Sequence, residues 1–359
     1  NKLRFGRIMP AVKTAVAYPL RSRLRTGMTL MMIGLITFAL VMVAAMNTNF
    51  AQIFLSNDAK GGFDIQVQGN PETPIQDLRK TLESSGISTT EIKSISRIRY
   101  AGFFETEIKL RESDGRFYSY GIMGVDDKFL QTNNIAIEQF AQGYSTSQEV
   151  WEALRTNPNF VVIPHGMTTG SSAFSVDSLL TLEPLIDNFE PFEISLRNKT
   201  TQEIITVTVI GKTDTAGDSF GVFMDAMGVS GAMIINNSVF EKALPDADLE
   251  YFYLTTSSAT NTEKLAKTIE STLVEASAES LQSLLDDQRA AATGFLLVLQ
   301  GFMGLGLIVG IAALGVISYR AVVERRQQIG MLRAIGYQRS MIALSFLLES
   351  GFIAIGGIG

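Results

Sequence analysis

Two long apolar runs without a charged residue constrain this chain more than any other feature. The first, Met28–Met46, has nineteen residues, and the second, Ala290–Tyr319, is longer. An α-helix rises about 1.5 Å per residue, so each run can cross a hydrocarbon core of roughly 30 Å. A third run, Met341–Gly359, is also apolar but contains Glu349. We therefore expect α-helical membrane spans at residues 28–47, 290–319 and 341–359, with the third truncated.

The charges beside these runs predict their orientation. Residues 1–27 carry seven Lys and Arg and no acid, and the link at residues 320–340 carries five Arg and one Glu. Short basic flanks stay in the cytoplasm. We expect a cytoplasmic N-terminus with an amphipathic lead-in at residues 1–27 and a cytoplasmic link at 320–340. The protein is then a multi-pass protein of the cell (inner) membrane.

The long segment between the first two runs, residues 48–289, is then extracytoplasmic. The segment from Asn47 to Arg289 holds 34 acidic and 18 basic residues, a net charge of −16, which argues against nucleic-acid binding. Its strand and helix patterns predict an α+β domain with a membrane-proximal lobe at about 48–130 and 235–289. Many short strand patterns at about 131–234 predict an inserted β-rich lobe. A helical pattern over Asn261–Asp287 is expected to continue into the second span.

Few residue patterns in this chain suggest catalysis. There is no cysteine, no glycine-rich phosphate loop, and a single histidine, His165, which is more often structural than catalytic. The adjacent pair Asp126 and Asp127 is expected to cap a helix or to carry solvated charge. We expect no enzyme activity, catalytic residue, metal site or cofactor in this chain.

The membrane runs contain two unusual features. Gly301, Gly306 and Gly310 are candidates for close helix packing, since small residues let helix backbones approach in lipid. The alternative is the general tolerance of membrane helices for glycine. Glu349 is an intramembrane polar residue, which should face protein or water because a carboxylate is costly in lipid.

The link resembles a known family. Residues 324–334 read ERRQQIGMLRA and are followed by Ile335 and Gly336. This resembles the FtsX-like (MacB-type) permease family of ABC transporters, whose second span is followed by E-R-x-x-x-I-G-x-L-R-A-I-G. The segments Tyr18–Leu30, Gly121–Phe129 and Phe346–Ser350 are similar to other parts of the family. A fourth span, which the family has, is absent here, so we expect the sequence to be one half of a larger permease.

The resemblance implies a mechanism and partners. It implies that the link couples a cytoplasmic ABC ATPase, which holds ATP and magnesium, to movement of the outer domain, for export, lipoprotein extraction or mechanotransmission. It also implies a second permease copy or a covalent sister half, surrounding lipid, and an extracytoplasmic protein or lipoprotein as a further partner. The coupling candidates are Glu324, Arg325, Arg326, Ile329, Gly330, Leu332, Arg333, Ala334 and Gly336. The alternative is a membrane-tethered sensor or ligand-binding module without an ATPase.

Overall fold

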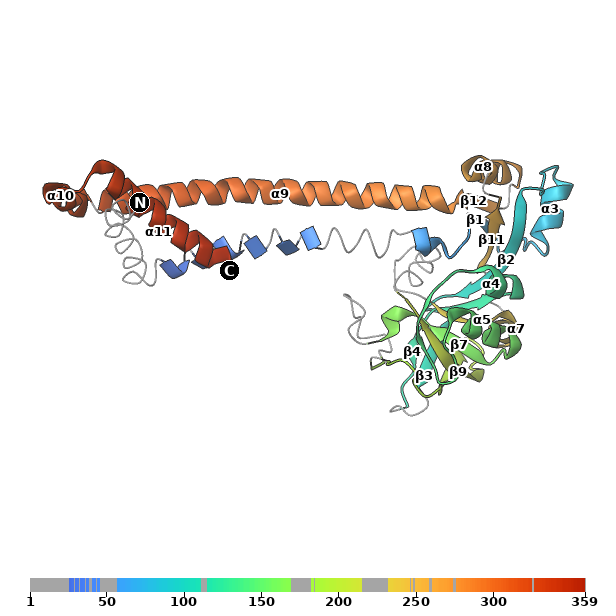
Figure 1. Ribbon diagram of the computed structural model, residues 1–359. Coiled ribbons are helices and arrows are strands. Elements are labelled where there is room, and N and C mark those ends of the chain that lie inside the picture. The colour runs from blue at the N-terminus through green and yellow to red at the C-terminus, as the bar shows by residue number, and fades with distance from the viewer. Residues whose placement is uncertain are drawn as a thin grey trace. The chain divides into compact units, whose positions relative to one another are not determined.

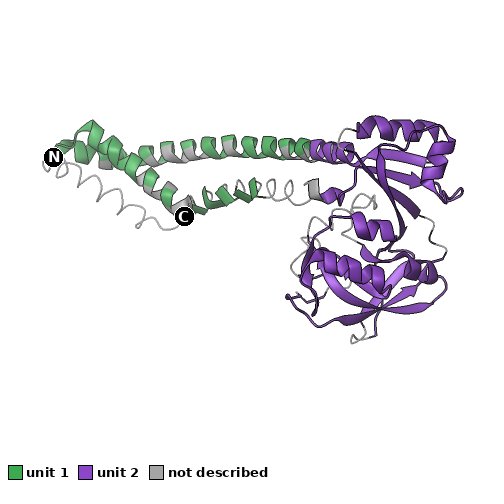
Figure 2. Cartoon of the chain, turned by 45° about the vertical axis from the view of Figure 1, so that its right-hand side comes forward, with its two compact units in different colours: residues 1–49, 292–359 green, residues 50–291 purple. Residues whose placement is uncertain are grey.

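The computed structural model divides into two compact units, which are coloured separately in Figure 2. Residues 50–291 form the outer unit, and residues 1–49 and 292–359 form the helical unit. The structure describes residues 57–110, 115–168, 182–183, 185–214, 232–245, 247, 249–257, 260–273, 276–324 and 326–358, with separate residues between 26 and 45. Most of the lead-in at residues 1–27 and part of the first expected span therefore lie outside the described residues.

Among the residues that the structure describes, the outer unit is built on one mixed sheet of twelve strands (Figure 1). Its order is β12-β1-β11-β2-β5-β10-β7-β9-β8-β3-β4, and β6 pairs with β9 off this path. The β5–β10 and β7–β9 pairs are parallel, and the others are antiparallel. The strands are β1 (Ile65–Gly69), β2 (Ile92–Ala101), β3 (Thr106–Leu110), β4 (Tyr118–Ser119), β5 (Ile122–Val125), β6 (Ile137–Phe140), β7 (Phe160–Ile163), β8 (Phe192–Asn198), β9 (Ile204–Thr213), β10 (Met233–Asn236), β11 (Leu249–Thr256) and β12 (Ala276–Ser280).

Helices of the outer unit begin at side chains that satisfy free backbone amides. The helices are α3 (Leu78–Ser84), α4 (Asp127–Thr132), α5 (Ser147–Thr156), α7 (Asn237–Ala243) and α8 (Thr262–Thr272), with short 3₁₀ helices η1 (Asn57–Lys60) and η2 (His165–Met167). Asp77 caps α3, Asp126 caps α4, and Asn261 caps α8, each by accepting a hydrogen bond from a backbone amide in the first turn. The expectation that Asp126 caps a helix is confirmed.

Two hydrophobic clusters form the interior of the outer unit. In β11, Phe252 and Leu254 belong to one cluster, while Tyr251 and Tyr253 belong to the other, because alternate side chains point to opposite faces of a strand. The smaller cluster includes side chains from α3 and α8, and the larger one includes side chains from α4, α5 and α7. The predicted division into a membrane-proximal and an inserted lobe stays a prediction.

The prediction of one helix over Asn261–Asp287 was partly wrong. Helix α8 ends at Thr272, and residues Ala276–Ser280 form β12, which pairs with β1 over Gly69↔Ala276 to Ile65↔Ser280. A new helix, α9 (Leu281–Glu324), starts directly after this strand. The segment Ala276–Ser280 has no strong local strand signal, and backbone pairing with β1 outweighs its helix propensity.

The helical unit contains the rest of α9, then α10 (Arg326–Ala334) and α11 (Arg339–Ile358) (Figure 1). Within the described residues, no helix combines the length and the apolar character that a membrane crossing needs. The spans expected at 28–47, 290–319 and 341–359 are therefore not found among these helices and stay predictions.

Candidate functional site

The residues proposed for coupling lie at the end of α9 and along α10. Arg320 and Glu324 form an ion pair one turn apart on α9, with Nε and Oε1 2.9 Å apart. Arg325 lies outside the described residues, and Arg326 is the first residue of α10 and is exposed. The basic link is thus mostly a separate nine-residue helix between two longer ones.

A glycine turn ends α10. The backbone amide of Gly336 donates to the carbonyl of Arg333 at 3.1 Å, and the amide of Tyr337 donates to that of Leu332 at 3.0 Å. This pair of bonds is the Schellman arrangement, in which the residue after the helix takes a positive φ. Gly336 has a φ of 102°, which a residue with a side chain rarely adopts. Gly336 thereby satisfies the last carbonyl groups of α10 and directs the chain towards α11.

The side chains of α10 divide into two groups. Ile329 and Leu332 are half-buried, whereas Arg333 is exposed and Met331 is 60% exposed. Ile335, just after the helix, is 77% exposed. Gly330 and Ala334 are also exposed and small. The exposed residues of α10 therefore include two guanidinium groups, those of Arg326 and Arg333, and one large apolar side chain, that of Met331.

The candidate packing glycines lie near the middle of α9. A methyl group at Gly301, Gly304 or Gly306 would meet no atom within 4 Å, so nothing in the described part of the chain packs against them. Gly310 is buried. Close packing at these glycines stays a prediction. The side chain of Glu349, in α11, lies outside the described residues.

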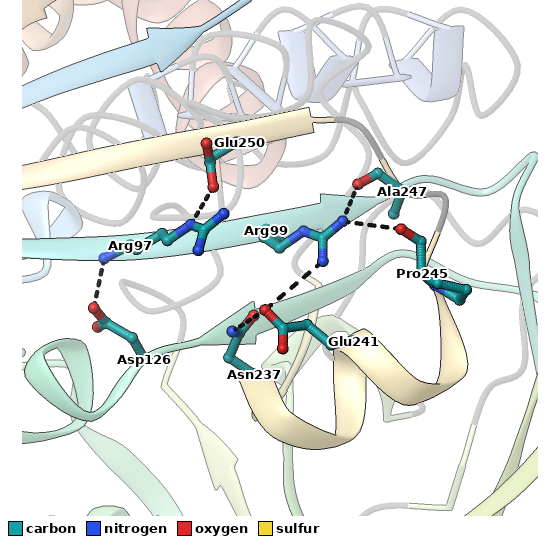
Figure 3. A network of polar contacts seen from close by, with 8 residues as sticks. All are labelled: Arg97, Arg99, Asp126, Asn237, Glu241, Pro245, Ala247 and Glu250. Carbon is teal, nitrogen blue, oxygen red and sulfur yellow. Dashed lines mark hydrogen bonds and ion pairs between the residues drawn. The ribbon is translucent and has the colours of Figure 1, made fainter. Parts of the chain in front are cut away.

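A second polar group lies in the outer unit, and the sequence patterns did not predict it (Figure 3). Arg97 and Arg99 point from β2, where Arg97 pairs with Glu250 of β11. Arg99 donates through Nη2 to the carbonyl oxygens of Ala247 at 2.6 Å and Pro245 at 3.3 Å. The only local signal was the alternation of two arginines with Ile98 in a strand, which is unusual beside a core.

These polar contacts join helices α4 and α7 to strand β2 of the sheet. The carboxylate of Asp126 accepts the backbone amide of Arg97 at 2.9 Å and that of Phe129 at 2.8 Å. Burial raises the pKa of Asp126, although these two amides partly offset the effect. The Arg99 guanidinium lies 5.5 Å from the Phe240 ring centroid and 3.9 Å from the Glu241 carboxylate, both on α7. The contacts are those of a structural network.

The single histidine also has structural partners. His165 Nδ1 lies 2.7 Å from Glu138 Oε2, and Lys212 Nζ lies 3.0 Å from the same oxygen. The Lys212 side chain is only 5% exposed, so this carboxylate neutralises a buried charge. Burial opposes ionisation of Glu138, but hydrogen bonds from Lys212 and His165 outweigh it and hold the pKa of Glu138 below its usual value. In the described residues, no group of three or more His, Asp or Glu could hold a metal ion.

The link at residues 320–340 lies within a segment that matches a known protein family. Residues 301–359 match the FtsX-like permease C-terminal family. This part of the chain is similar to that family. The FtsX-like region contains the second half of α9 together with α10 and α11, and therefore every coupling candidate from Glu324 to Gly336. The similarity noted for the link is thus confirmed, whereas those of Tyr18–Leu30 and Gly121–Phe129 lie outside the matched residues.

Three solved structures are similar to part of the chain. The periplasmic region of MacB from Actinobacillus actinomycetemcomitans is 11% identical, with a TM-score of 0.36 over 66% of this chain and 97% of that one. The extracellular domain of the noncanonic ABC-type transporter YknZ from Gram-positive bacteria is 11% identical, with a TM-score of 0.33 over 61% and 99%. A domain of a putative permease protein from Porphyromonas gingivalis is 10% identical, with a TM-score of 0.34 over 62% and 90%. No curated protein sequence matches the chain.

Proposed function

We propose that this chain is a permease subunit, or half of one, in an ABC transporter-type complex. It has no catalytic role of its own, and a partner ATPase on the cytoplasmic side holds ATP and magnesium. ATP hydrolysis by that partner moves the outer unit, which performs export, lipoprotein extraction or mechanotransmission. The observation that carries the proposal is that helix α10 lies within the FtsX-like region and has exposed side chains.

The surface of α10 fits a protein partner. Arg333 can form a charge-assisted hydrogen bond with a carboxylate, and Met331 and Ile335 are exposed apolar side chains of the same segment. Arginine and methionine are enriched where proteins bind one another. The Gly336 turn joins the two residues after the cap to α10 through two backbone hydrogen bonds, so a force on α10 would pass to α11 through a short, hydrogen-bonded connection.

The apolar surface of α9 supports a place in the membrane. Phe302, Leu305, Ile308 and Ile311 are each more than 60% exposed. At about 100° per residue, they cover roughly half of the circumference of the helix. Gly306 and Gly310 lie on the other half. Lipid would cover the first half, and a second permease copy or a sister half would pack on the second.

The test uses the full chain in mild detergent, purified together with its ATPase, and measures nucleotide hydrolysis that co-purifies. Arg333→Glu should lower it by about tenfold or more, because a lost interfacial charge pair commonly costs about 2–5 kcal/mol. Lys264→Glu is the matched control, since it makes the same charge change at an exposed helical residue of the outer unit. It should retain wild-type hydrolysis.

Two outcomes would contradict the proposal. If Arg333→Glu and Lys264→Glu both retain the ATPase, α10 is not the docking element. If no ATP hydrolysis accompanies the wild-type chain under any detergent condition that keeps it folded, the membrane-tethered sensor without an ATPase is the better interpretation.

A further inference from the structure

One face of the sheet in the outer unit carries no buried side chain on strands β3, β4, β8 and the first part of β9. The inward face of the same strands holds Ile108, Leu196 and Val207, all at most 1% exposed. On that inward side, Asn198 Nδ2 donates to the carbonyl of Ala243, at the end of α7. The outward side chains alternate with these, and each is half-buried or exposed. We call this outward surface the β3–β8 face.

The strand register places the outward residues in two rows. Glu107 lies opposite Ser119 and Arg197, and Arg197 lies opposite Ile204. In the next row, Ser195 lies between Lys109 and Thr206. The centre of the face is therefore made of short Ser and Thr side chains, with longer charged and apolar side chains around them. Ile204 is 52% exposed, which adds an apolar position to one row.

Cations gather on this face around one aromatic ring. The Arg197 guanidinium carbon lies 3.8 Å from the Phe117 ring centroid, and Lys109 Nζ lies 5.8 Å from it. Lys199 Nζ donates to Ser119 Oγ and to the carbonyl of Phe103, both at 2.6 Å. Stacking of cations on a ring holds their side chains in place, which lowers the entropy that they lose on binding.

Two of these cations lack a carboxylate partner. Glu107 pairs with Arg197, but neither Lys109 nor Lys199 contacts a carboxylate among the residues that the structure describes. The segment that contains them has 34 acidic and 18 basic residues. Ammonium groups left without a carboxylate in so acidic a domain are suited to an acidic group from outside.

We propose that the β3–β8 face docks a carboxylate-rich segment of a partner protein on the side of the outer unit. Its carboxylates meet Lys109 and Lys199, and one apolar side chain meets Ile204 or the edge of Phe117. A uniformly anionic surface such as a lipid bilayer fits less well, because Glu107 and Glu193 lie on the same face and repel it. An extended peptide can place its carboxylates beside Lys109 and Lys199 and keep them away from Glu107 and Glu193. The proposal does not depend on the ATPase partner.

The experiment measures binding of a defined probe to the full chain in detergent. The probe is a fluorescein-labelled peptide of alternating Glu and Ser with one central Val, about ten residues long, the length of a long strand. Fluorescence anisotropy should show binding that weakens as salt is raised from about 50 to about 300 mM, since screening reduces attraction between exposed charges. The same peptide with Lys in place of Glu should not bind.

Variants locate the site. Lys109→Glu should weaken binding of the peptide by about tenfold, because attraction becomes repulsion at that position. Lys199→Gln should weaken it less, since only one charge is removed. The control Lys264→Glu, on α8, makes the same charge change as Lys109→Glu and should remain within about twofold of the wild type. Fluorescence of Trp151, the single tryptophan, checks that each variant is folded.

Four outcomes would overturn the proposal. The first is that the wild type does not bind the peptide, and the second is that Lys264→Glu weakens binding as much as Lys109→Glu does. The third is that vesicles of anionic lipid compete for Lys109 more strongly than the peptide, which would make lipid the ligand. The fourth is sedimentation that shows self-association of the chain and its loss in Lys109→Glu, in which case a second copy occupies the face.

Discussion

At the scale of single residues, the outer unit depends on charges that are paired inside it. Glu138 joins β6 to Lys212 of β9 and to His165, which follows β7. Lys212 is almost fully buried, whereas the Glu138 side chain is 42% exposed. Water can therefore reach the carboxylate but not the amine. Removal of the carboxylate leaves a buried ammonium without a charged acceptor, which is costly.

We expect Glu138→Gln to destabilise the outer unit by about 1–3 kcal/mol at neutral pH, because Lys212 keeps only a neutral acceptor. The folded pKa of Glu138 lies below its unfolded value. Its contribution is therefore full above the unfolded pKa and is lost as pH falls through the folded pKa. The difference in unfolding midpoint between wild type and variant should shrink below about pH 4.5.

Urea unfolding followed by Trp151 fluorescence at neutral and acid pH measures this difference. Glu263→Gln, at an exposed carboxyl on α8 whose pKa is also lowered by its hydrogen bond from Lys267, is the control and should change the midpoint little at either pH. A Glu138→Gln effect that stays constant with pH would show that the carboxylate charge is not what matters.

At the scale of elements, helix α7 packs directly against strand β5 at Gly124, a residue without a side chain. A methyl group at Gly124 would lie 2.5 Å from Cβ and Cγ of Phe240, closer than atoms can approach. Phe240 is fully buried, and Arg99 lies over its ring. The glycine is thus needed for close approach of a helix, which explains one residue of the segment Gly121–Phe129.

Gly124→Ala should lower the free energy of unfolding by about 1–3 kcal/mol, because α7 must move away from β5 or Phe240 must leave its rotamer. Gly102→Ala is the matched control, since its methyl group would meet only Tyr100 Cε1 at 3.8 Å, an ordinary contact. Trp151 fluorescence during urea unfolding compares the two. Equal stability of the two variants would mean that α7 is not packed against Gly124 in solution.

At the scale of the whole molecule, the distribution of charge leads to a prediction about the two units. The acidic segment belongs to the outer unit, and the basic link belongs to the helical unit. If the apolar runs cross a membrane, the two segments lie on opposite sides of it. The absence of cysteine makes this simple to measure, because any introduced cysteine is the only thiol in the chain.

Gln142→Cys and Gln327→Cys each introduce one exposed thiol, in the outer unit and on α10, respectively. A maleimide that cannot cross membranes should label Gln142→Cys in intact cells or spheroplasts. It should label Gln327→Cys only after the cells are permeabilised. Labelling of both positions in sealed cells would contradict the proposed orientation, and so would the reverse pattern.

Several strands, and the segment that contains the proposed coupling residues, could be recognised from local patterns. The basic, motif-bearing link became α10, and the alternating pattern of Leu249–Thr255 became β11. Such features depend on neighbours within a few residues, so a short window of sequence contains the information. The end of α10 at Gly336 is of this kind, because glycine is favoured wherever φ is positive.

Only the tertiary structure decided which segments meet. Ala276–Ser280 is a strand because β1 lies beside it, and Lys109 and Arg197 share a face because β3 pairs with β8. The free energy of such pairing comes from residues far apart in the sequence, and no local periodicity records it. The sequence by itself therefore determined the apolar runs, the charge asymmetry and the similarity of the C-terminal region to a known family. The single mixed sheet, its two clusters and the β3–β8 face follow from long-range pairing.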